Sequence, residues 1–514
     1  MNRKLALIPV DARPVTRDLP GQIAAIAGWD VLVPDRGQLG FLKMPGDQSE
    51  FLVWLDRVAS EVDGFILSLD MIGYGGLVPS RVIEDEFSTI WSRIEQVLQL
   101  KRRYPEKKLF AFSATMRISN NYVNEEEKDY WDRYGEEIWQ YSYHTHCFQR
   151  TASEESKRMI DDLYGRIPSE ILDDYLQTRE RNFSISKKLL EKVEEKLIDI
   201  LVFPQDDTSE YGLNIREQEQ LSADVEKRNL FNNVFIYPGA DEVATTLTAR
   251  AILEAEFIKA PTFYPFYSGE TGKLKPAMYE DRPIVESVKG QIHVVGGHTV
   301  ETVNDADLLL GVNVPGQQQG DLALQKNLQY VNTNGRDVGE WIRRLVYYQK
   351  QGYKVAVADL AYANGADPVM MSRLLGEPDV LSHLVGFGAW NTAGNTIGTV
   401  VAQAAMHYVH HKSGFDRSDE KLKEQILLRL FDDYLYQTIV RQQVRNEMAG
   451  PESKVNDLVK VVENRFLENY DNLIQTEGVQ KLLRDYEVDL GTTFLPWNRT
   501  FEIGLKVRLQ RNIC

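Results

Sequence analysis

The stretch DILVFPQDDTSEYG (residues 199–212) indicates both the fold class and the first candidate site. It begins with a continuous apolar run and leads into two adjacent carboxylates, Asp206 and Asp207. Continuous apolar runs are typical of strands buried on both faces, as in parallel sheets covered by helices. In such folds, functional side chains stand at the carboxyl ends of strands. The stretch therefore predicts a buried parallel strand that delivers an acid pair to the edge of a sheet.

Ten further apolar runs occur along the chain, separated by stretches with helical periodicity. With 199–205 they make eleven candidate strands, the others being 5–10, 30–34, 64–70, 108–114, 233–239, 262–267, 292–297, 307–314, 354–360 and 384–390. Alternating strands and helices predict an α/β protein with mostly parallel sheets. Eleven strands are too many for one eight-stranded barrel, so we favour two Rossmann-like domains; an elaborated (β/α)8 barrel is the alternative.

A break near Lys259–Pro261 separates six candidate strands from five. We predict an N-terminal Rossmann-like domain at 1–258 and a second at 259–412. The segment 121–198, rich in Glu, Lys, Tyr and Trp, predicts a helical insertion in the first domain. Residues 413–514 predict a mainly helical C-terminal region that becomes strand-like near its end and returns to the core.

The composition excludes several classes of protein. Of the 514 residues, 43% are hydrophobic and 26% charged, which is ordinary for a folded domain and argues against disorder. The net charge of −17 argues against a surface that wraps nucleic acid. Two cysteines make no disulfide framework, the first apolar run is too short for a signal peptide, and no run approaches a membrane span. We expect a cytoplasmic protein with no nucleic-acid or membrane partner.

Charged and amide side chains follow most of the candidate strands. Burying such groups costs several kcal/mol unless they are paired or functional, so we assign them to substrate binding. The predicted set is Asp11, Arg13, Asp70, Arg81, Arg117, Glu210, Asp241, Glu242, Asp359, Trp390, Asn391 and Asn395. Arginine suits a substrate carboxylate or phosphate. The alternative is internal pairing, for instance Arg13 with Asp11 or Arg81 with Asp70; for Trp390 it is core packing.

The adjacent acids Asp206 and Asp207 are the predicted catalytic residues. Their mutual repulsion should raise one pKa, and a protonated acid beside an ionised one suits glycoside hydrolysis. The alternative is that one acid caps the next helix, with Glu210 completing a capping box. Three glycines in GYGGLVPSR (73–81) predict a tight turn or a close approach to a ligand, and no phosphate-binding glycine motif occurs.

Several segments together resemble the bacterial domain-of-unknown-function 4127 family. They are IPVDARPV (8–15), LDMIGYGGLVPSR (69–81), FPQDDTSEYG (203–212), YPGADEVA (237–244), YEDRPIVESV (279–288), ADLLLGVNVPG (306–316), FGAWNTAGNTIGT (387–399) and LPWNRTFEI (495–503). The resemblance runs almost from end to end. It implies a bacterial, cytoplasmic-looking protein that occurs in sugar-scavenging settings beside amino-sugar enzymes.

The Asp206–Asp207 strand end also resembles that of O-GlcNAcase-type hexosaminidases. In that family one aspartate orients the N-acetyl group of the substrate and the other is the general acid–base. The resemblance covers one strand end only. It implies that Asp206 polarises the acetamide and that Asp207 protonates the leaving oxygen.

Three hypotheses for function follow. The first is a glycan-acting hydrolase for an acidic or N-acetylated amino sugar, with the acid pair as its catalytic groups. The second is a hydrolase or lyase assisted by Mg²⁺ or Mn²⁺, with hard ligands from Asp70, Asp206, Asp241 and Asp359. The third is a non-catalytic protein that binds a small anion. No cofactor is expected apart from the ion of the second hypothesis, and no metal ligand is assigned under the first.

Overall fold

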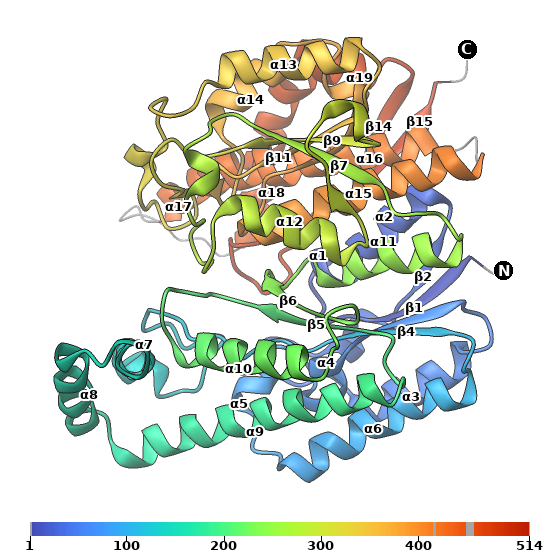
Figure 1. Cartoon of the computed structure of the whole chain (residues 1–514). Coiled ribbons are helices and arrows are strands. Elements are labelled where there is room, and N and C mark those ends of the chain that lie inside the picture. Colours follow the sequence, from blue (N-terminus) through green and yellow to red (C-terminus); the bar gives the residue numbers. More distant parts are fainter. Residues whose placement is uncertain (1–2, 415–417, 449–456, 513–514) are drawn as a thin grey trace. The chain divides into compact units, whose positions relative to one another are not determined.

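The apolar strands assemble into two open, mostly parallel sheets in the computed structural model, which describes residues 3–414, 418–448 and 457–512 (Figure 1). Neither sheet closes on itself, so the prediction of two Rossmann-like domains is confirmed and the barrel alternative is wrong. Ten of the eleven candidate strands are strands in the structure.

The first sheet has six strands in the order β2-β1-β3-β4-β5-β6. Their bounds are β1 Lys4–Ile8, β2 Asp30–Leu32, β3 Gly64–Ser68, β4 Lys108–Phe112, β5 Ile200–Gln205 and β6 Val234–Pro238. Neighbours from β1 through β3, β4 and β5 to β6 are parallel. Alternate side chains point to the same face of a strand, and Phe65, Leu67, Leu201 and Phe203 accordingly share one buried apolar cluster.

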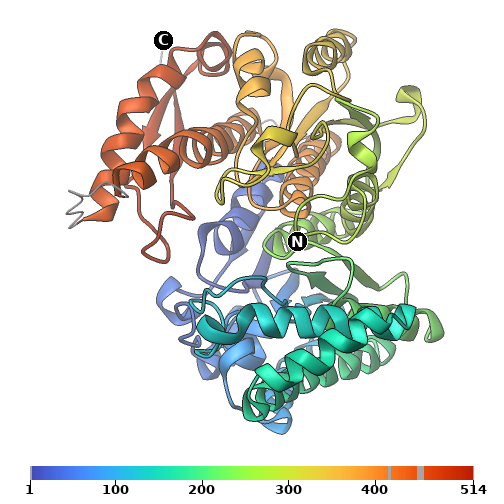
Figure 2. The ribbon, with the colours of Figure 1, turned by 90° about the vertical axis from the view of Figure 1, so that its left-hand side faces the viewer.

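Helices complete that cluster on one side of the first sheet. The helices of this part are α3 Gln48–Val58, α4 Leu69–Tyr74, α5 Pro79–Val82, α6 Phe87–Arg103, α7 Trp131–Thr151, α8 Glu154–Arg166, α9 Ser169–Glu194 and α10 Leu213–Lys227. Figure 1 shows α3, α6 and α9 along the same face of the sheet. The predicted insertion at 121–198 is helical, with α7 packed against α8 and α9 continuing beside α6 (Figure 2).

The second sheet has five strands in the order β13-β11-β9-β7-β8. Their bounds are β7 Thr262–Tyr267, β8 His298–Thr299, β9 Leu308–Asn313, β11 Val355–Asp359 and β13 Leu384–Gly388, and all four pairings are parallel. Read from the edge at β8 to the edge at β13, and numbered by their order along the chain, the strands of this sheet have the order 2-1-3-4-5. The first five strands of the first sheet have the same order, which is the flavodoxin-like arrangement with its switch point between the first and third strands.

Helices and two small sheets surround the second sheet. The helices are α1 Pro14–Arg17, α2 Leu19–Ala24, α11 Val243–Ala255, α12 Ile284–Val294, α13 Val338–Lys350, α14 Pro368–Leu375, α15 Ala393–Ser413, α16 Ser418–Arg429, a π-helix at Leu430–Val440, α17 Arg441–Met448, α18 Leu458–Ile474 and α19 Glu477–Leu482. One small sheet pairs β10 Gly320–Asp321 with β12 Tyr362–Ala363, and the other pairs β14 Tyr486–Leu490 with β15 Val507–Arg511. The described part of the C-terminal region is therefore mainly helical, with a strand at its end.

The predicted strand at 292–297 is wrong. Residues 292–294 form the last turn of α12, and β8 begins only at His298. Ile284, Val288 and Ile292 recur every four residues and are fully buried, so the apolar run belongs to a helical face. A four-residue apolar run at a helix end has the same composition as a short strand, and the wider period distinguishes the two.

Contacts within the chain divide it into two units. The first unit comprises residues 1–12, 31–244 and 279–281, and the second comprises 13–30, 245–278 and 282–514. No helix among the described residues is long and apolar enough to cross a membrane.

The glycine turn after α4 gives a test of the fold. Gly75 ends α4 with φ +88°, and a Cβ atom there would lie 2.5 Å from Cβ of Pro45. We expect Gly75→Ala to lower the free energy of unfolding by about 2–4 kcal/mol, because it adds both backbone strain and a steric clash. The control is Gly165→Ala in α8, where the added methyl group meets nothing within 4 Å. Urea unfolding measures both variants; equal stabilities would contradict the prediction.

Candidate functional site

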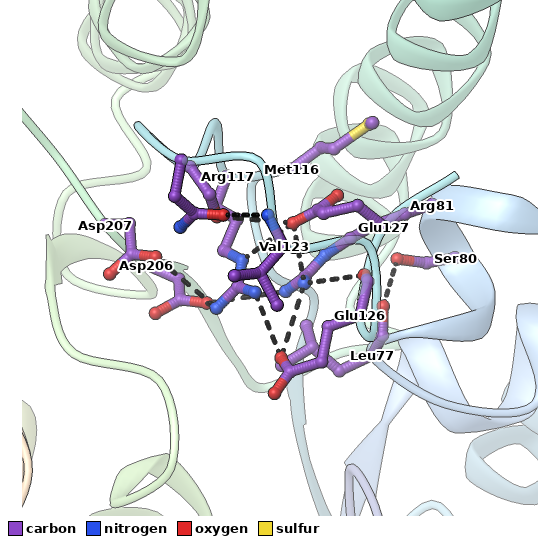
Figure 3. A network of polar contacts seen from close by, with 12 residues as sticks. Leu77, Ser80, Arg81, Met116, Arg117, Val123, Glu126, Glu127, Asp206 and Asp207 are labelled. Atoms are coloured by element: carbon purple, nitrogen blue, oxygen red, sulfur yellow. Dashed lines mark hydrogen bonds and ion pairs between the residues drawn. The ribbon is translucent and has the colours of Figure 1, made fainter. Parts of the chain in front are cut away.

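Four of the predicted strand-end residues meet at the carboxyl edge of the first sheet. Asp206 and Asp207 follow β5, Arg117 follows β4, and Arg81 lies on α5 after β3. Figure 3 shows these side chains converging with two glutamates from the loop before α7. We call this group the acid–arginine network; its members are Arg81, Arg117, Glu126, Glu127, Asp206 and Asp207.

Arg81 is the buried centre of the network, with only 1% of its side chain exposed. One terminal nitrogen, Nη1, lies 3.3 Å from Oε1 of Glu127 and 3.7 Å from Oε2 of Glu126. The other, Nη2, lies 3.4 Å from Oδ2 of Asp206. Arg81 thus contacts three carboxylates of its own unit, in place of the pairing with Asp70 considered from the sequence.

Arg117 contacts all four carboxylates. Its Nε donates to Glu127 and its Nη2 to Glu126, each at 3.0 Å. Its Nη1 lies 3.5 Å from Oδ2 of Asp206 and 3.4 Å from Oδ2 of Asp207. These carboxylates hold the pKa of Arg117 well above its ordinary value against the opposing effect of burial. One guanidinium group therefore brings both aspartates of the acid pair to the same nitrogen atom.

Asp207 has the properties of a proton donor. Its φ of +46° is the left-handed conformation, which is uncommon outside glycine and concentrates at functional sites. Withdrawal from water raises its pKa to about 7, Asp206 raises it as well, and Arg117 opposes the change. The side chain is still 27% exposed, the most of the acids in contact with Arg117. Asp207 can therefore hold a proton near neutral pH and deliver it to a molecule in solvent.

The helical insertion fixes the two segments that carry the arginines. On α9, Arg179 forms a buried ion pair with Glu217 of α10 at 2.6 Å and donates to the carbonyl oxygen of Met116 at 2.9 Å. Asn182, one turn further on, donates to the carbonyl oxygen of Ser80 at 2.9 Å. Met116 and Ser80 directly precede Arg117 and Arg81, so α9 positions both guanidinium groups through their backbones.

Asp70 lies close enough to the network for the charge of Arg81 to affect it. It is 2% exposed, and its Oδ2 accepts a hydrogen bond from the backbone N–H of Ala114 at 2.8 Å. Burial raises the pKa of Asp70 to about 7, while the Ala114 N–H and the charge of Arg81 oppose the change. Asp70 is therefore a buried acid with a pKa near neutral pH, and its hydrogen bond with Ala114 fixes the backbone just after β4.

The other predicted residues of the first unit follow β1, β5 and β6. Glu242 is fully buried and accepts a hydrogen bond from the backbone N–H of Ala240 at 2.9 Å, which gives it a role in the turn after β6. Asp11 and Asp241 are 8% and 5% exposed, and Glu210 is exposed in the loop after Asp207. Their roles in substrate binding stay predictions.

Asp359 is part of a closed polar cluster in the second unit. It accepts hydrogen bonds from the side-chain amide of Asn313 at 2.8 Å and the backbone N–H of Asp367 at 2.6 Å. Asp367 in turn pairs with Arg336 at 2.7 Å. Burial raises the pKa of Asp359 to about 7, and Asp367 adds to the rise. At 1% exposure Asp359 supports the strand ends and is withdrawn from solvent.

The π-helix closes the same edge of the second sheet. Its Asp433 accepts the backbone N–H of Ala389, just after β13, at 2.7 Å, and pairs with Arg429 at 3.0 Å. Burial raises the pKa of Asp433 to about 7. A π-helix of eleven residues is rare, and such segments concentrate at functional sites. Here it directs an acid onto the end of a buried strand.

Trp390, Asn391, Asn395 and Arg13 also belong to the second unit. Trp390 is 5% exposed and donates its indole N–H to Thr399 at 3.2 Å, as a packed core residue does. Asn391 is left-handed with φ +51°, like Asp207 after the corresponding strand, and Asn395 is 2% exposed. Arg13 lies 3.6 Å from Glu502 and its guanidinium carbon 4.6 Å from the ring centre of Trp497.

Several residues of these clusters were missed at the sequence level. Glu126 and Glu127 stand in the run NEEEKD, which has the composition of an exposed helical surface. Asp367 precedes Pro368 and caps α14, a recognisable signal for a helix start but none for its contact with Arg336. Among the described residues, no group of three or more His, Cys, Asp or Glu side chains is arranged to hold a metal ion.

The raised pKa of Asp70 predicts a pH-dependent cost to stability. The folded protein keeps Asp70 protonated while the unfolded chain ionises it above its ordinary pKa of 3.8, so stability falls as pH rises from about 4 to about 7. Asp70→Asn removes this loss and keeps an oxygen for the Ala114 N–H. The variant should gain stability over the wild type with rising pH, by no more than about 4 kcal/mol.

Denaturant unfolding between pH 4 and pH 8 measures this difference. The control is Asp173→Asn, because Asp173 is exposed on α9. A constant difference between Asp70→Asn and the wild type over this range would show that Asp70 ionises equally in both states.

Comparison with known proteins identifies the family of the chain. A family model described as "Protein of unknown function (DUF4127)" matches residues 5–506. No curated protein and no solved structure matches. Since the match covers nearly the whole chain, both units and the acid–arginine network included, the protein belongs to the DUF4127 family.

Proposed function

We propose that this protein is a hydrolase that cleaves a glycosidic bond of an amino-sugar derivative, with Asp206 and Asp207 as its catalytic groups. The observation that carries the proposal is the unequal pair. Withdrawal from water raises the pKa of Asp207 to about 7 although its side chain is partly exposed, while Asp206 contacts the guanidinium groups of both Arg81 and Arg117. One protonated acid and one ionised carboxylate are the two groups that glycoside hydrolysis uses.

In this proposal Asp207 donates its proton to the glycosidic oxygen as the bond to the anomeric carbon breaks. Asp206 is the fixed negative charge that stabilises the positive charge developing on the sugar ring, or that orients an N-acetyl group in an N-acetylated substrate. Arg81 and Arg117 act through Asp206, because their terminal nitrogens already contact carboxylates of the protein. Once the leaving group has departed, Asp207 accepts a proton from the attacking water.

The proposed setting is carbohydrate metabolism in the bacterial cytoplasm, with a small sugar derivative as the partner. A small partner agrees with the acidic net charge of the protein, because that charge disfavours binding to polyanions such as nucleic acids. The absence of nucleic-acid and membrane partners is part of the same proposal.

Hydrolysis of aryl glycosides of N-acetylhexosamines and of muropeptide fragments tests the proposed function. Asp207→Asn should lower kcat/KM by about 10²–10⁴-fold, the contribution typical of one general acid–base group. The control is Asp161→Asn on the exposed surface of α8, which should behave as wild type. Equal inactivity of wild type and Asp207→Asn on the whole panel would refute the proposal.

The pH profile supplies an independent test of the role of Asp207. A general acid must be protonated to work, so kcat/KM should fall as pH rises through about 7. Arg117→Gln removes a group that lowers the pKa of Asp207, so in an active variant this descending limb should move to higher pH. A limb at the same pH in both enzymes would assign the titration to another group.

A further inference from the structure

Three aromatic rings lie beside the loop that carries the acid pair. Trp139 and Tyr143 stand one turn apart on α7, and their ring centres are 5.4 Å apart with an angle of 28° between planes. Tyr211, in the loop after Asp207, meets Tyr143 edge-on at 5.4 Å. All three side chains are partly exposed. We call Trp139, Tyr143 and Tyr211 the aromatic platform.

The platform is fastened directly to the acid-pair loop. On α7, Ser142 accepts the backbone N–H of Leu213 at 2.7 Å, and Nδ1 of His146 accepts that of Gly212 at 3.2 Å. Asn214 donates to the carbonyl oxygen of Asp207 at 3.4 Å. Four residues of chain span at most about 14 Å, so Tyr211 lies within two or three sugar rings of Asp207.

Packing of the protein explains only part of this arrangement. Trp139 lies against the edge of the apolar cluster formed by Trp131, Ile138, Tyr175 and their neighbours. Tyr143 and Tyr211 lie outside that cluster and keep part of their surface in solvent. Two tyrosines that add little to the core, held next to a candidate catalytic loop, are more consistent with a binding surface than with a folding role.

A carboxylate stands next to the rings. Glu210 is exposed, and its charge raises the pKa of both Tyr143 and Tyr211 beyond the effect of their withdrawal from water. An aromatic face next to a hydrogen-bond acceptor matches a pyranose ring, which has an apolar C–H face and a rim of hydroxyl donors. The same pairing of apolar rings with a few polar groups is general in small-molecule sites.

We propose that the aromatic platform is a sugar-binding subsite, which holds a second pyranose ring of a substrate whose glycosidic bond lies at Asp207. Glu210 accepts hydrogen bonds from the hydroxyl groups of that ring. The proposal rests on the proposed function and makes the substrate an oligosaccharide of at least two rings rather than a single sugar derivative.

The experiment compares binding of the trimer and the monomer of N-acetylglucosamine by titration calorimetry. Wild type should bind the trimer at least about tenfold more tightly, since one aromatic contact contributes roughly that factor. Tyr211→Ala should lose most of this advantage, and Tyr143→Leu, which keeps an apolar side chain on α7, should lose part of it. The control is Tyr164→Ala, whose ring on α8 is 61% exposed and outside the platform.

Each outcome decides one of the two proposals. No trimer binding by wild type, or the same trimer advantage in both platform variants, overturns the subsite. Trimer binding that depends on Tyr211 and Tyr143, in a protein that hydrolyses none of the glycosides, supports the subsite and refutes the hydrolase. Thermal unfolding of each variant tests whether a loss of binding comes from a loss of folding.

Discussion

Two guanidinium groups hold four carboxylates together at the carboxyl edge of the first sheet. Arg81 and Arg117 offset the mutual repulsion of the charges on Glu126, Glu127, Asp206 and Asp207. The sequence predicts that these arginines bind a substrate anion, and that role stays a prediction. In the structure each arginine contacts three or more carboxylates of its own unit.

The two units have the same strand order and use it differently. In the first, the end of β5 carries two partly exposed acids, Asp206 and Asp207, whereas Asp70 after β3 is buried. In the second, Asp359 and Asp433 stand at or against corresponding strand ends but are almost fully buried and satisfied by Asn313, Arg429 and backbone N–H groups. Burial with complete hydrogen bonding is typical of structural polar clusters. Exposure therefore separates Asp207 from the buried acids Asp70, Asp359 and Asp433, whose pKa values are also raised to about 7.

The helical insertion connects the architecture to the proposed chemistry. Its helix α9 holds the backbone next to both arginines, and its helix α7 holds the loop after the acid pair. The same α7 carries two rings of the aromatic platform. The insertion therefore contacts the backbone next to both arginines and the loop that follows the acid pair.

The sequence by itself determined the fold class, ten strands, the helical insertion and the positions of Asp206, Asp207 and Arg117 just after strands. These features follow from local patterns, because continuous apolar runs specify buried strands and the residue after a strand stands at the edge of its sheet. The repeat of one strand order in two units left no trace in sequence, because topology depends on which strands pair and each sheet packs different side chains.

Only the tertiary structure decided which strand-end charges share a network and which are buried. Glu126 and Glu127 have the sequence pattern of surface charges, and only the folded loop before α7 brings them against Arg81 and Arg117. Burial and charge pairing depend on neighbours that are distant in sequence, and these neighbours raise the pKa of Asp207 while enclosing Asp359. Local pattern places a side chain at an edge, whereas its partners and its access to water are properties of the assembled fold.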